Sequence, residues 1–241
     1  MNIIITSKND FSSKSAILVA QKIIELQADP HKNVNLVLAT GGTMVDFLNC
    51  LSQQEGIDWS RVVAFHLDEY KGLPIDHPSS FAQFLNKNLF SKVAIPSKNI
   101  NYINGANPDI ASYIAKLKNS GGADIIMLGV GIDGHLAFNE PPLYSNFDGR
   151  MGEVKLTPST ISVNKPDYPE IETNPFAYSM GMADIFEGKN LFFLARGNKK
   201  ADIVAKSLQG PITPDVPASM LQNHPNVTII LDQPAASLLK K

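Results

Sequence analysis

Short runs of apolar, often β-branched residues recur along the chain, with more polar segments between them. The runs cover residues 2–6, 35–40, 62–67, 124–130, 190–195 and 226–231. Both alternating faces of each run are largely apolar, which is typical of a strand that is buried on both sides of a sheet. The pattern therefore predicts six buried strands.

Segments with helical periodicity lie between these runs. The clearest cover residues 12–27, 108–122 and 198–210. In the first segment we expect a cap at Ser12 or Ser13 and a helical period marked by Ile17, Ala20 and Ile24. The second segment begins with Pro-Asp and ends at a pair of glycines, which are frequent signals of helix boundaries.

The alternation of strands and helices predicts the α/β class, with a doubly wound, mainly parallel, Rossmann-like sheet covered by helices on both faces. No break in composition and no internal repeat divides residues 1–241, so we expect a single domain. Residues 69–100 and 141–185 interrupt the alternation, and we expect loops and small helices there. The second of these regions is rich in Pro, Asn and Ser and is a candidate lid or excursion over a site.

Composition and charge exclude several classes of function. The chain has 21 Lys and Arg against 23 Asp and Glu, a formal charge of −2, so it offers no basic surface for nucleic acid or an anionic membrane. Cys50 is the single cysteine, which excludes an internal disulfide and favours a reducing compartment. Without a signal peptide or an apolar run of about 18 residues, we expect a cytoplasmic protein. Self-association is possible, because a pattern of apolar residues does not distinguish an exposed face from a buried one.

The first candidate for chemistry is LATGGTMVDFL, residues 38–48. A strand ends at Thr40, Gly41 and Gly42 allow a tight turn, and Thr43 is expected to cap the helix that follows. Free amides at a helix N-terminus suit a phosphate, although a plain strand-to-helix turn has the same pattern. The glycines of a dinucleotide fingerprint and the lysine of a P-loop are missing, which favours a monophosphate.

The second candidate is FHLDEYKGLP, residues 65–74. Here a strand is expected to deliver His66 and Asp68 to the same side of its carboxyl end, with Glu69 and Tyr70 in the turn beyond. Adjacent carboxylates of this kind often belong to a turn or an ion pair. At the ligand-binding edge of a parallel sheet, however, a partly desolvated carboxylate could abstract a proton from carbon.

The third candidate is GVGIDGHLAFNEPP, residues 129–142. Gly129 and Gly131 let the backbone approach a ligand, and Asp133, His135 and Glu140 follow within a short loop. A histidine can move a proton efficiently when a carboxylate fixes its ring, and either acid could do so here. A capping Asp beside a structural His is the alternative, and the absence of a second His at ligand spacing disfavours a metal site.

The fourth candidate is ARGNKKAD, residues 195–202. A strand ends at Ala195, and Lys199 and Lys200 then enter the first turn of a helix. Cations are unfavourable at that end of a helix, so at least one of them is a candidate for an anion contact, although a solvated surface pair would look the same. Together the four segments indicate a phosphorylated sugar and proton transfer at carbon or ring oxygen, without a metal or an organic cofactor.

These segments resemble the glucosamine-6-phosphate deaminases (isomerases), within the wider group that includes the 6-phosphogluconolactonases. The resemblance runs through LATGGT, LDEYKGLPIDHPSSF, LGVGIDGHLAFNEPP, LTPST, GNKKA and GPITPDVPASMLQNHP. It implies an enzyme that isomerises and deaminates an amino-sugar 6-phosphate, converting glucosamine 6-phosphate to fructose 6-phosphate and ammonia without a cofactor.

The resemblance also implies roles for residues. Asp68 would be the base that moves a proton between C2 and C1, and His135, held by Asp133 and Glu140, would open the sugar ring. The loop Thr40, Gly41, Gly42 and Thr43, together with Lys200, would hold the phosphate.

Two departures from the family pattern bear on substrate binding. Met44 stands where the family usually has Pro, which is expected to change the stiffness of the loop. After LTPST the family usually carries an arginine that binds the phosphate, whereas ISVNKPDYPEIETNPF contains none. Lys165 is the nearest replacement, but an ammonium cannot form the bidentate contact of a guanidinium. The basic residues used for allosteric control in the family have no clear counterpart, so we expect no activation by an amino sugar.

Three alternatives remain at the level of sequence. A 6-phosphogluconolactonase, which is a hydrolase, would keep the fold, but Asn139, Glu140 and Tyr70 argue against it. An enzyme for galactosamine 6-phosphate would need to differ at only one hydroxyl contact. A sugar-phosphate sensor without turnover would normally carry a DNA-binding segment and would not need Asp68 and His135.

Overall fold

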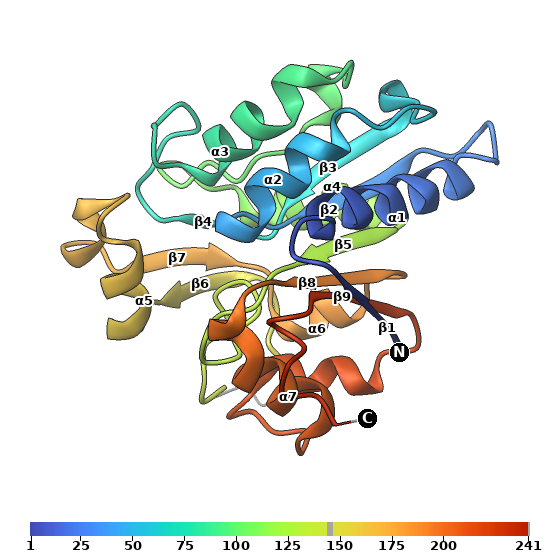
Figure 1. The fold of residues 1–241 in the computed structure, drawn as a ribbon. Helices are drawn as coiled ribbons and strands as arrows, with labels where there is room; N and C mark the ends of the chain where they lie inside the picture. The colour runs from blue at the N-terminus through green and yellow to red at the C-terminus, as the bar shows by residue number, and fades with distance from the viewer. Residues whose placement is uncertain (144–146, 241) are drawn as a thin grey trace.

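Six parallel strands form the central sheet of the computed structural model, which describes residues 1–143 and 147–240 (Figure 1). They are β1 (Asn2–Thr6), β2 (Val34–Leu38), β3 (Val62–His66), β5 (Ile125–Leu128), β8 (Leu191–Ala195) and β9 (Val227–Asp232). Their order is β1-β9-β8-β5-β2-β3, and every pairing between them is parallel. Each strand coincides with one of the six predicted runs, so the predicted fold class is confirmed.

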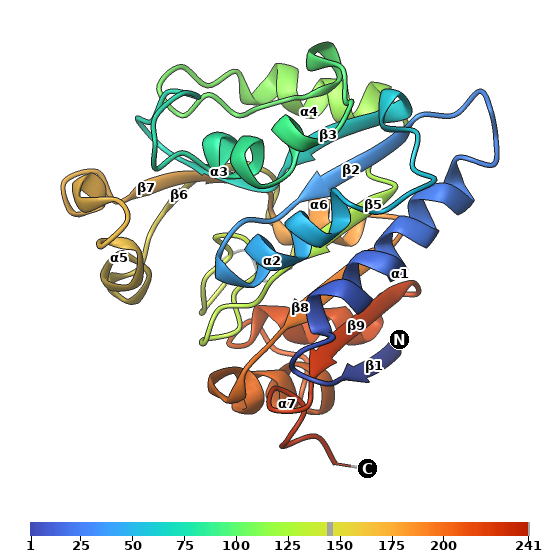
Figure 2. The ribbon, with the colours of Figure 1, turned by 45° about the horizontal axis from the view of Figure 1, so that its top comes forward.

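Helices cover both faces of this sheet, and one further helix, α5 (Pro158–Asn164), projects away from it (Figure 1). They are α1 (Phe11–Leu26), α2 (Gly42–Leu51), α3 (Phe81–Asn88), α4 (Ile110–Asn119), α5 (Pro158–Asn164), α6 (Met182–Phe186) and α7 (Ala201–Gln209). Short 3₁₀ turns occupy Trp59–Arg61, Phe90–Lys92, Ser97–Asn99, Pro169–Glu172, Asn198–Lys200 and Pro217–Asn223. In both views α1 and α2 lie on one face of the sheet and α6 and α7 on the other (Figures 1 and 2). None of the helices in the described ranges is long and apolar enough to cross a membrane.

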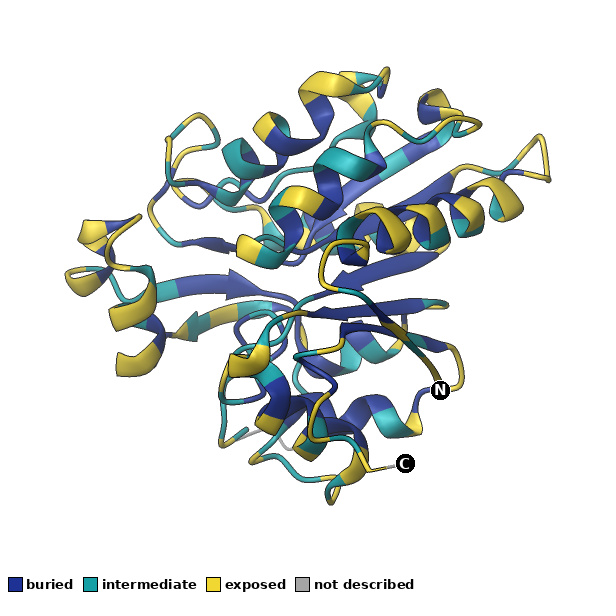
Figure 3. Cartoon of the chain, in the orientation of Figure 1, coloured by how far each residue is buried: buried dark blue, intermediate teal, exposed yellow. Residues whose placement is uncertain are grey.

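The inner strands are buried as predicted, but β1 is not (Figure 3). Every residue of β2, β5 and β8 is buried, whereas Ile3 and Ile5 of β1 are 38% and 53% exposed. β1 lies at the edge of the sheet and pairs only with β9. An apolar run alone does not reveal whether a strand is central or at an edge, because both contain the same residues.

The first predicted helix exists and buries Ala20 as expected, but the rest of its buried face differs from the prediction. Ile17 and Ile24 are 41% and 39% exposed, and Ala16, Val19 and Ile23 face the core instead. The helix begins at Phe11 without a side-chain cap, so Ser12 and Ser13 lie inside its first turn. The predicted helix at residues 108–122 is α4, which Asp109 caps by accepting from the amide of Ser112.

A second, antiparallel sheet was not predicted. It consists of β4 (Asp68–Tyr70), β7 (Phe176–Ser179) and β6 (Gly152–Lys155), in the order β4-β7-β6. Glu69 and Tyr70 therefore belong to a strand rather than a turn, and the excursion at 141–185 contains strands as well as loops and helices. Residues 144–146 of that excursion and residue 241 lie outside the described residues.

A small core of its own holds the second sheet together. Its buried members are Tyr70, Leu73, Phe138, Leu156, Tyr168, Ile171 and Ala177. In both views β6, β7 and α5 project from the central sheet (Figures 1 and 2). Because β3 of the central sheet ends at His66 and β4 of the second sheet begins at Asp68, Asp68 lies where the chain passes from one sheet to the other.

Candidate functional site

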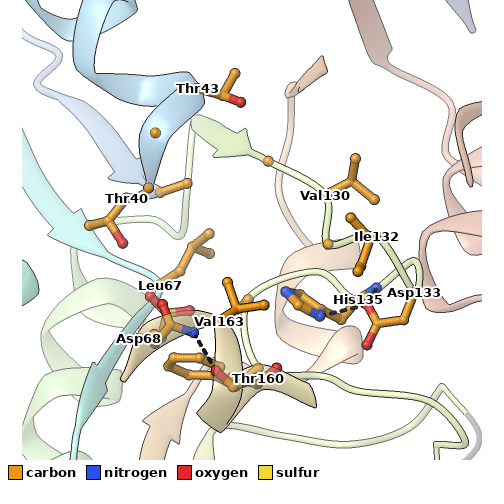
Figure 4. Close-up of a pocket in the computed structure, with 18 of the residues that line it drawn as sticks. Thr40, Thr43, Leu67, Asp68, Val130, Ile132, Asp133, His135, Thr160 and Val163 are labelled. Carbon is orange, nitrogen blue, oxygen red and sulfur yellow. Dashed lines mark hydrogen bonds and ion pairs between the residues drawn. The ribbon is translucent and has the colours of Figure 1, made fainter. Parts of the chain in front are cut away.

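A cavity of about 590 Å³ opens at the carboxyl ends of the central strands. The loops after β2, β3, β5 and β8 contribute to its lining, and α5 contributes a further wall. All four segments singled out in the sequence meet there, as expected for a doubly wound sheet. Figure 4 shows Asp68 and the pair His135–Asp133 on two sides of the cavity, with Thr40 and Thr43 at one end.

The loop after β2 supplies backbone amides to one end of the cavity. Gly41 has a φ of 99°, a value that favours glycine, and α2 begins at the next residue. A Cβ at Gly42 would meet no atom within 4 Å, so the space in front of the loop is open. The first amides of a helix have no acceptor within the helix, which makes this end of α2 suitable for an anion.

Thr43 and Met44 have roles at the start of α2 that differ from those predicted. Thr43 lies inside α2 and does not cap it; Gly41 holds the cap position without a side-chain hydrogen bond. Met44 is fully buried, and its amide donates to the carbonyl of Gly41 at 2.9 Å. A proline at that position has no amide hydrogen to donate, so Met44 adds a bond that the usual family residue lacks.

Asp68 is the buried carboxylate of the site. Its side chain reaches the cavity, although only 6% of the residue is exposed. Burial raises the pKa of Asp68 to about 8, and the neighbouring Glu69 carboxylate adds to the rise. A carboxylate with such a pKa is a stronger base than a solvated one.

Glu69 faces away from the cavity and anchors α3. Its carboxylate accepts hydrogen bonds from the amides of Tyr70, Phe81 and Ala82 at 2.9 to 3.1 Å. Burial raises the pKa of Glu69 to about 7, against the effect of these three bonds. Asp68 and Glu69 are therefore neighbours in sequence with different partners, and Asp68 is the one that lines the cavity.

His66 is not part of the cavity, which contradicts the expectation that it would share a side with Asp68. It is fully buried, and its Nε2 accepts from the amide of Ile103 at 2.7 Å. Burial lowers the pKa of His66 to about 3, so the ring is neutral. The alternation rule fails because β3 ends at His66 and the chain changes sheet before Asp68.

His135 and Asp133 form a close pair on the loop after β5. Nδ1 of His135 lies 2.7 Å from Oδ1 of Asp133, and the same oxygen accepts the amide of His135 at 3.2 Å. Partial burial acts to raise the pKa of Asp133, but the contacts with His135 outweigh it and leave the pKa below its ordinary value. The carboxylate is thus held in its charged form beside the ring.

Glu140 belongs to the same cluster but is held by other residues. Its carboxylate accepts the amide and the hydroxyl of Thr157 at 2.7 and 2.8 Å, and the hydroxyl of Thr160 also contacts it. The side chains of the cluster lie close together: one nitrogen of His135, one carboxylate oxygen of Asp133 and one of Glu140 are within 4.8 Å of one another. This spacing also suits a cation. The LTPST segment therefore fixes the third member of the cluster.

The two lysines assigned to substrate binding are in different places. Lys200 lines the cavity, and its Nζ donates to the carbonyl of Val130 at 2.8 Å. Burial lowers the pKa of Lys200, and the charge of Asp133 opposes this effect. Lys165, in contrast, is exposed, pairs with Glu172 at 2.8 Å and does not line the cavity. The structure therefore does not support Lys165 as the replacement of the missing arginine. Gly129, in contrast, lines the cavity.

Comparison with known proteins agrees with this geometry. The model of the family described as glucosamine-6-phosphate isomerases/6-phosphogluconolactonase matches residues 6–230. The chain belongs to this family. It is 40% identical to a glucosamine-6-phosphate deaminase of Clostridium acetobutylicum over 243 residues, covering 98% of this chain and 99% of that one. It is also 40% identical to glucosamine-6-phosphate deaminase 2 of Bacillus subtilis over 228 residues, covering 90% and 91%.

Solved structures of the family have the same fold. A monomeric glucosamine-6-phosphate deaminase superposes with a TM-score of 0.89 at 32% identity, covering 99% of this chain and all of the other. A 6-phosphogluconolactonase from Thermotoga maritima superposes with a TM-score of 0.77 at 20% identity, covering 96% and 99%. At the lower identity the likeness concerns the fold alone.

Several residues of this family member line the cavity although the sequence did not single them out. Arg196 follows directly after β8, and Thr160 and Asn164 belong to α5. The position of Arg196 was a usable signal, because the residue after a parallel strand is expected at the ligand-binding edge. For α5 the LTPST segment was the available signal, but the position of the helix beside the cavity depends on the second sheet.

Proposed function

We propose that the chain converts glucosamine 6-phosphate to fructose 6-phosphate with release of ammonia. The observation that carries this proposal is that one cavity brings together a buried carboxylate, a histidine paired with a carboxylate, and the free amides at the start of α2. Relatives named glucosamine-6-phosphate deaminase at 40% identity over most of both chains support the choice of substrate.

The phosphate end of the substrate is assigned to the loop after β2. The amides of Gly41, Gly42 and Thr43 carry partial positive charge at the start of α2, and Thr40 precedes them. Lys200 adds a full charge at the cavity, and Gly129 leaves room for the ligand to approach. A phosphate fixed at this end would direct C1 and C2 of the sugar toward the acids and the histidine.

Ring opening is assigned to His135. The ring of His135 would transfer the proton of the C1 hydroxyl to the ring oxygen, which breaks the bond between C1 and that oxygen. Asp133 fixes the ring through its 2.7 Å contact, and Glu140 lies beside both. Asp133 and Glu140 are thus positioning residues for this step.

Isomerisation is assigned to Asp68. In the open chain Asp68 would take the proton from C2 while the C2 ammonium gives up one proton and the C1 oxygen gains one, which leaves a neutral enolamine; Asp68 would then deliver its proton to C1. This leaves an iminium at C2; water adds there and ammonia leaves, so one water is consumed for each ammonia released. The positive charge of the amino group beside Asp68 would lower its pKa from about 8 and favour the base form.

The decisive assay is direct. Purified protein is given glucosamine 6-phosphate, and we expect equimolar ammonia and fructose 6-phosphate. Galactosamine 6-phosphate and 6-phosphogluconolactone are run in parallel. If either of these is turned over and glucosamine 6-phosphate is not, the proposed substrate is wrong; binding of all three without any turnover would indicate a sensor.

We also propose that the excursion at 141–185 serves the site as a cover within a single domain spanning 1–241. α5 supports this, since Ser159, Thr160, Val163 and Asn164 line the cavity. Because the chain has a single cysteine, we propose the reducing cytoplasm as its location.

A further inference from the structure

The cavity carries two cationic side chains among its described lining residues, and the proposed function has used only one. Lys200 donates to the carbonyl of Val130, and Arg196 pairs with Asp46 of α2, the helix that follows the phosphate loop. Arg196 directly follows Ala195, the last residue of β8, so it starts from the edge of the sheet where ligands are bound.

Hydrogen bonds to Asp232 hold the turn that carries Arg196. Gly197 has a φ of 86°, and its amide donates to both carboxylate oxygens of Asp232 at 2.9 and 3.0 Å. Asp232 is the last residue of β9 and is buried. The backbone of Arg196 is therefore tied to two neighbouring strands.

The side chain of Arg196 is held by a residue of the phosphate-loop helix. Its Nη1 donates to Oδ2 of Asp46 at 2.8 Å, and the two side chains are 41% and 57% exposed. An ion pair as exposed as this contributes little to stability. Asp46 lies one helical turn after Gly42, so its charge without a partner would repel an anion at the start of α2.

A guanidinium has five N–H donors, and the pair with Asp46 uses one. We propose that Arg196 is the phosphate-binding arginine of this chain and that Asp46 positions it. This inference rests on the proposed function in that it assumes a phosphorylated substrate. It accounts for the missing arginine after Thr160, because a guanidinium reaches the phosphate from the end of β8 instead.

The test is a set of substitutions at Arg196. For Arg196→Met we expect the KM for glucosamine 6-phosphate to rise about 10- to 100-fold, the range for losing a hydrogen bond to a charged group, with kcat changed much less. Arg196→Lys keeps the charge but loses the planar guanidinium that can form two parallel hydrogen bonds. Its KM should therefore lie between that of wild type and that of Arg196→Met. The inhibition constant of inorganic phosphate should rise in the same order. Asp46→Asn should raise KM less than Arg196→Met.

Two controls make the result specific. Arg150 is an exposed arginine paired with Asp184 and Glu187 outside the cavity, and Arg150→Lys should leave KM unchanged. Lys165→Met should also leave KM unchanged. Wild-type values of KM and phosphate inhibition in Arg196→Met would overturn the inference, and so would a Lys165→Met variant with the larger rise in KM.

Calorimetric titration with inorganic phosphate separates this inference from the proposed reaction. If wild type releases no ammonia but binds phosphate, and Arg196→Met binds it at least about 10-fold more weakly, the inference stands and the proposed reaction fails. If wild type turns over and Arg196→Met binds phosphate equally well, the inference fails alone. Arg196→Lys and Asp46→Asn provide the same readout should the Met variant not fold.

Discussion

Ionisation of the buried Asp68 side chain lowers the stability of the folded protein. The side chain is buried, and its raised pKa means that the folded state holds a proton that the unfolded state has already released between about pH 4 and pH 8. In that range each increase in pH therefore lowers the contribution of Asp68 to stability. Functional carboxylates commonly show this conflict between activity and stability.

Replacing Asp68 by Asn should remove both the activity and this cost. We expect the midpoint of thermal unfolding of Asp68→Asn to exceed that of wild type by a few degrees near pH 8 and by much less near pH 4. Thermal unfolding across this pH range measures the difference. A constant difference at all pH values would mean that the charge of Asp68 is not the cause.

The same pKa predicts the pH dependence of the reaction. Asp68 acts as a base only when unprotonated, so kcat/KM should increase as the pH approaches about 8 and level off above it. Initial rates at low substrate concentration give this profile, because kcat/KM reports the free enzyme. The range from pH 6 to pH 8 extends from about two units below the pKa of Asp68 up to that pKa. If kcat/KM does not change within this range, Asp68 is not the base.

At the scale of the element, the loop after β5 depends on a glycine. A Cβ on Gly131 would lie 2.2 Å from Cε1 of His135 and 2.6 Å from Oδ1 of Asp133. We expect Gly131→Ala to displace the pair and to lower kcat/KM about 100-fold or more, since catalysis is sensitive to such misplacement.

A second glycine provides the matched control for this variant. At Gly152 in β6 a Cβ would come no closer than 3.9 Å to the carbonyl of Arg150, so Gly152→Ala should retain full activity. Both variants should keep thermal stability close to wild type, because Gly131 lies in a loop outside the core. Equal activity of the two variants would show that the geometry of His135 and Asp133 is not critical.

The elements also show how far a pattern of residues can predict structure. Six strands were predictable because each is a run of apolar residues in a sheet covered on both sides. β4, β6 and β7 are three or four residues long and pair through long-range contacts, for example Asp68 opposite Ser179. At that length periodicity does not distinguish a strand from a loop.

At the scale of the whole molecule, α5, which belongs to the excursion at 141–185, lines one side of the cavity. Val163 of α5 lines the cavity and is 63% exposed, which leaves apolar surface for a ligand to cover (Figure 4). Fructose 6-phosphate should therefore slow amide hydrogen exchange in α5, while α4, which does not line the cavity, provides the internal control. Equal exchange in α5 with and without the sugar would argue against a cover.

The sequence by itself determined the central sheet and indicated the family. It also predicted that most of the candidate site residues would lie together, because residues at the ends of parallel strands meet at one edge whatever the loops do. It placed Asp68, His135, Asp133, Glu140 and Lys200 among the candidates, and each lies at the cavity or beside its histidine. Tertiary structure decided what depends on contacts between distant segments. In the structure His66 and Lys165 make contacts outside the cavity, and Glu140 accepts a hydrogen bond from Thr157. Arg196 contacts Asp46, from which it is 150 residues away in the sequence. Such contacts depend on side-chain direction and on where a strand changes sheet, and neither is contained in a pattern of apolar and polar positions.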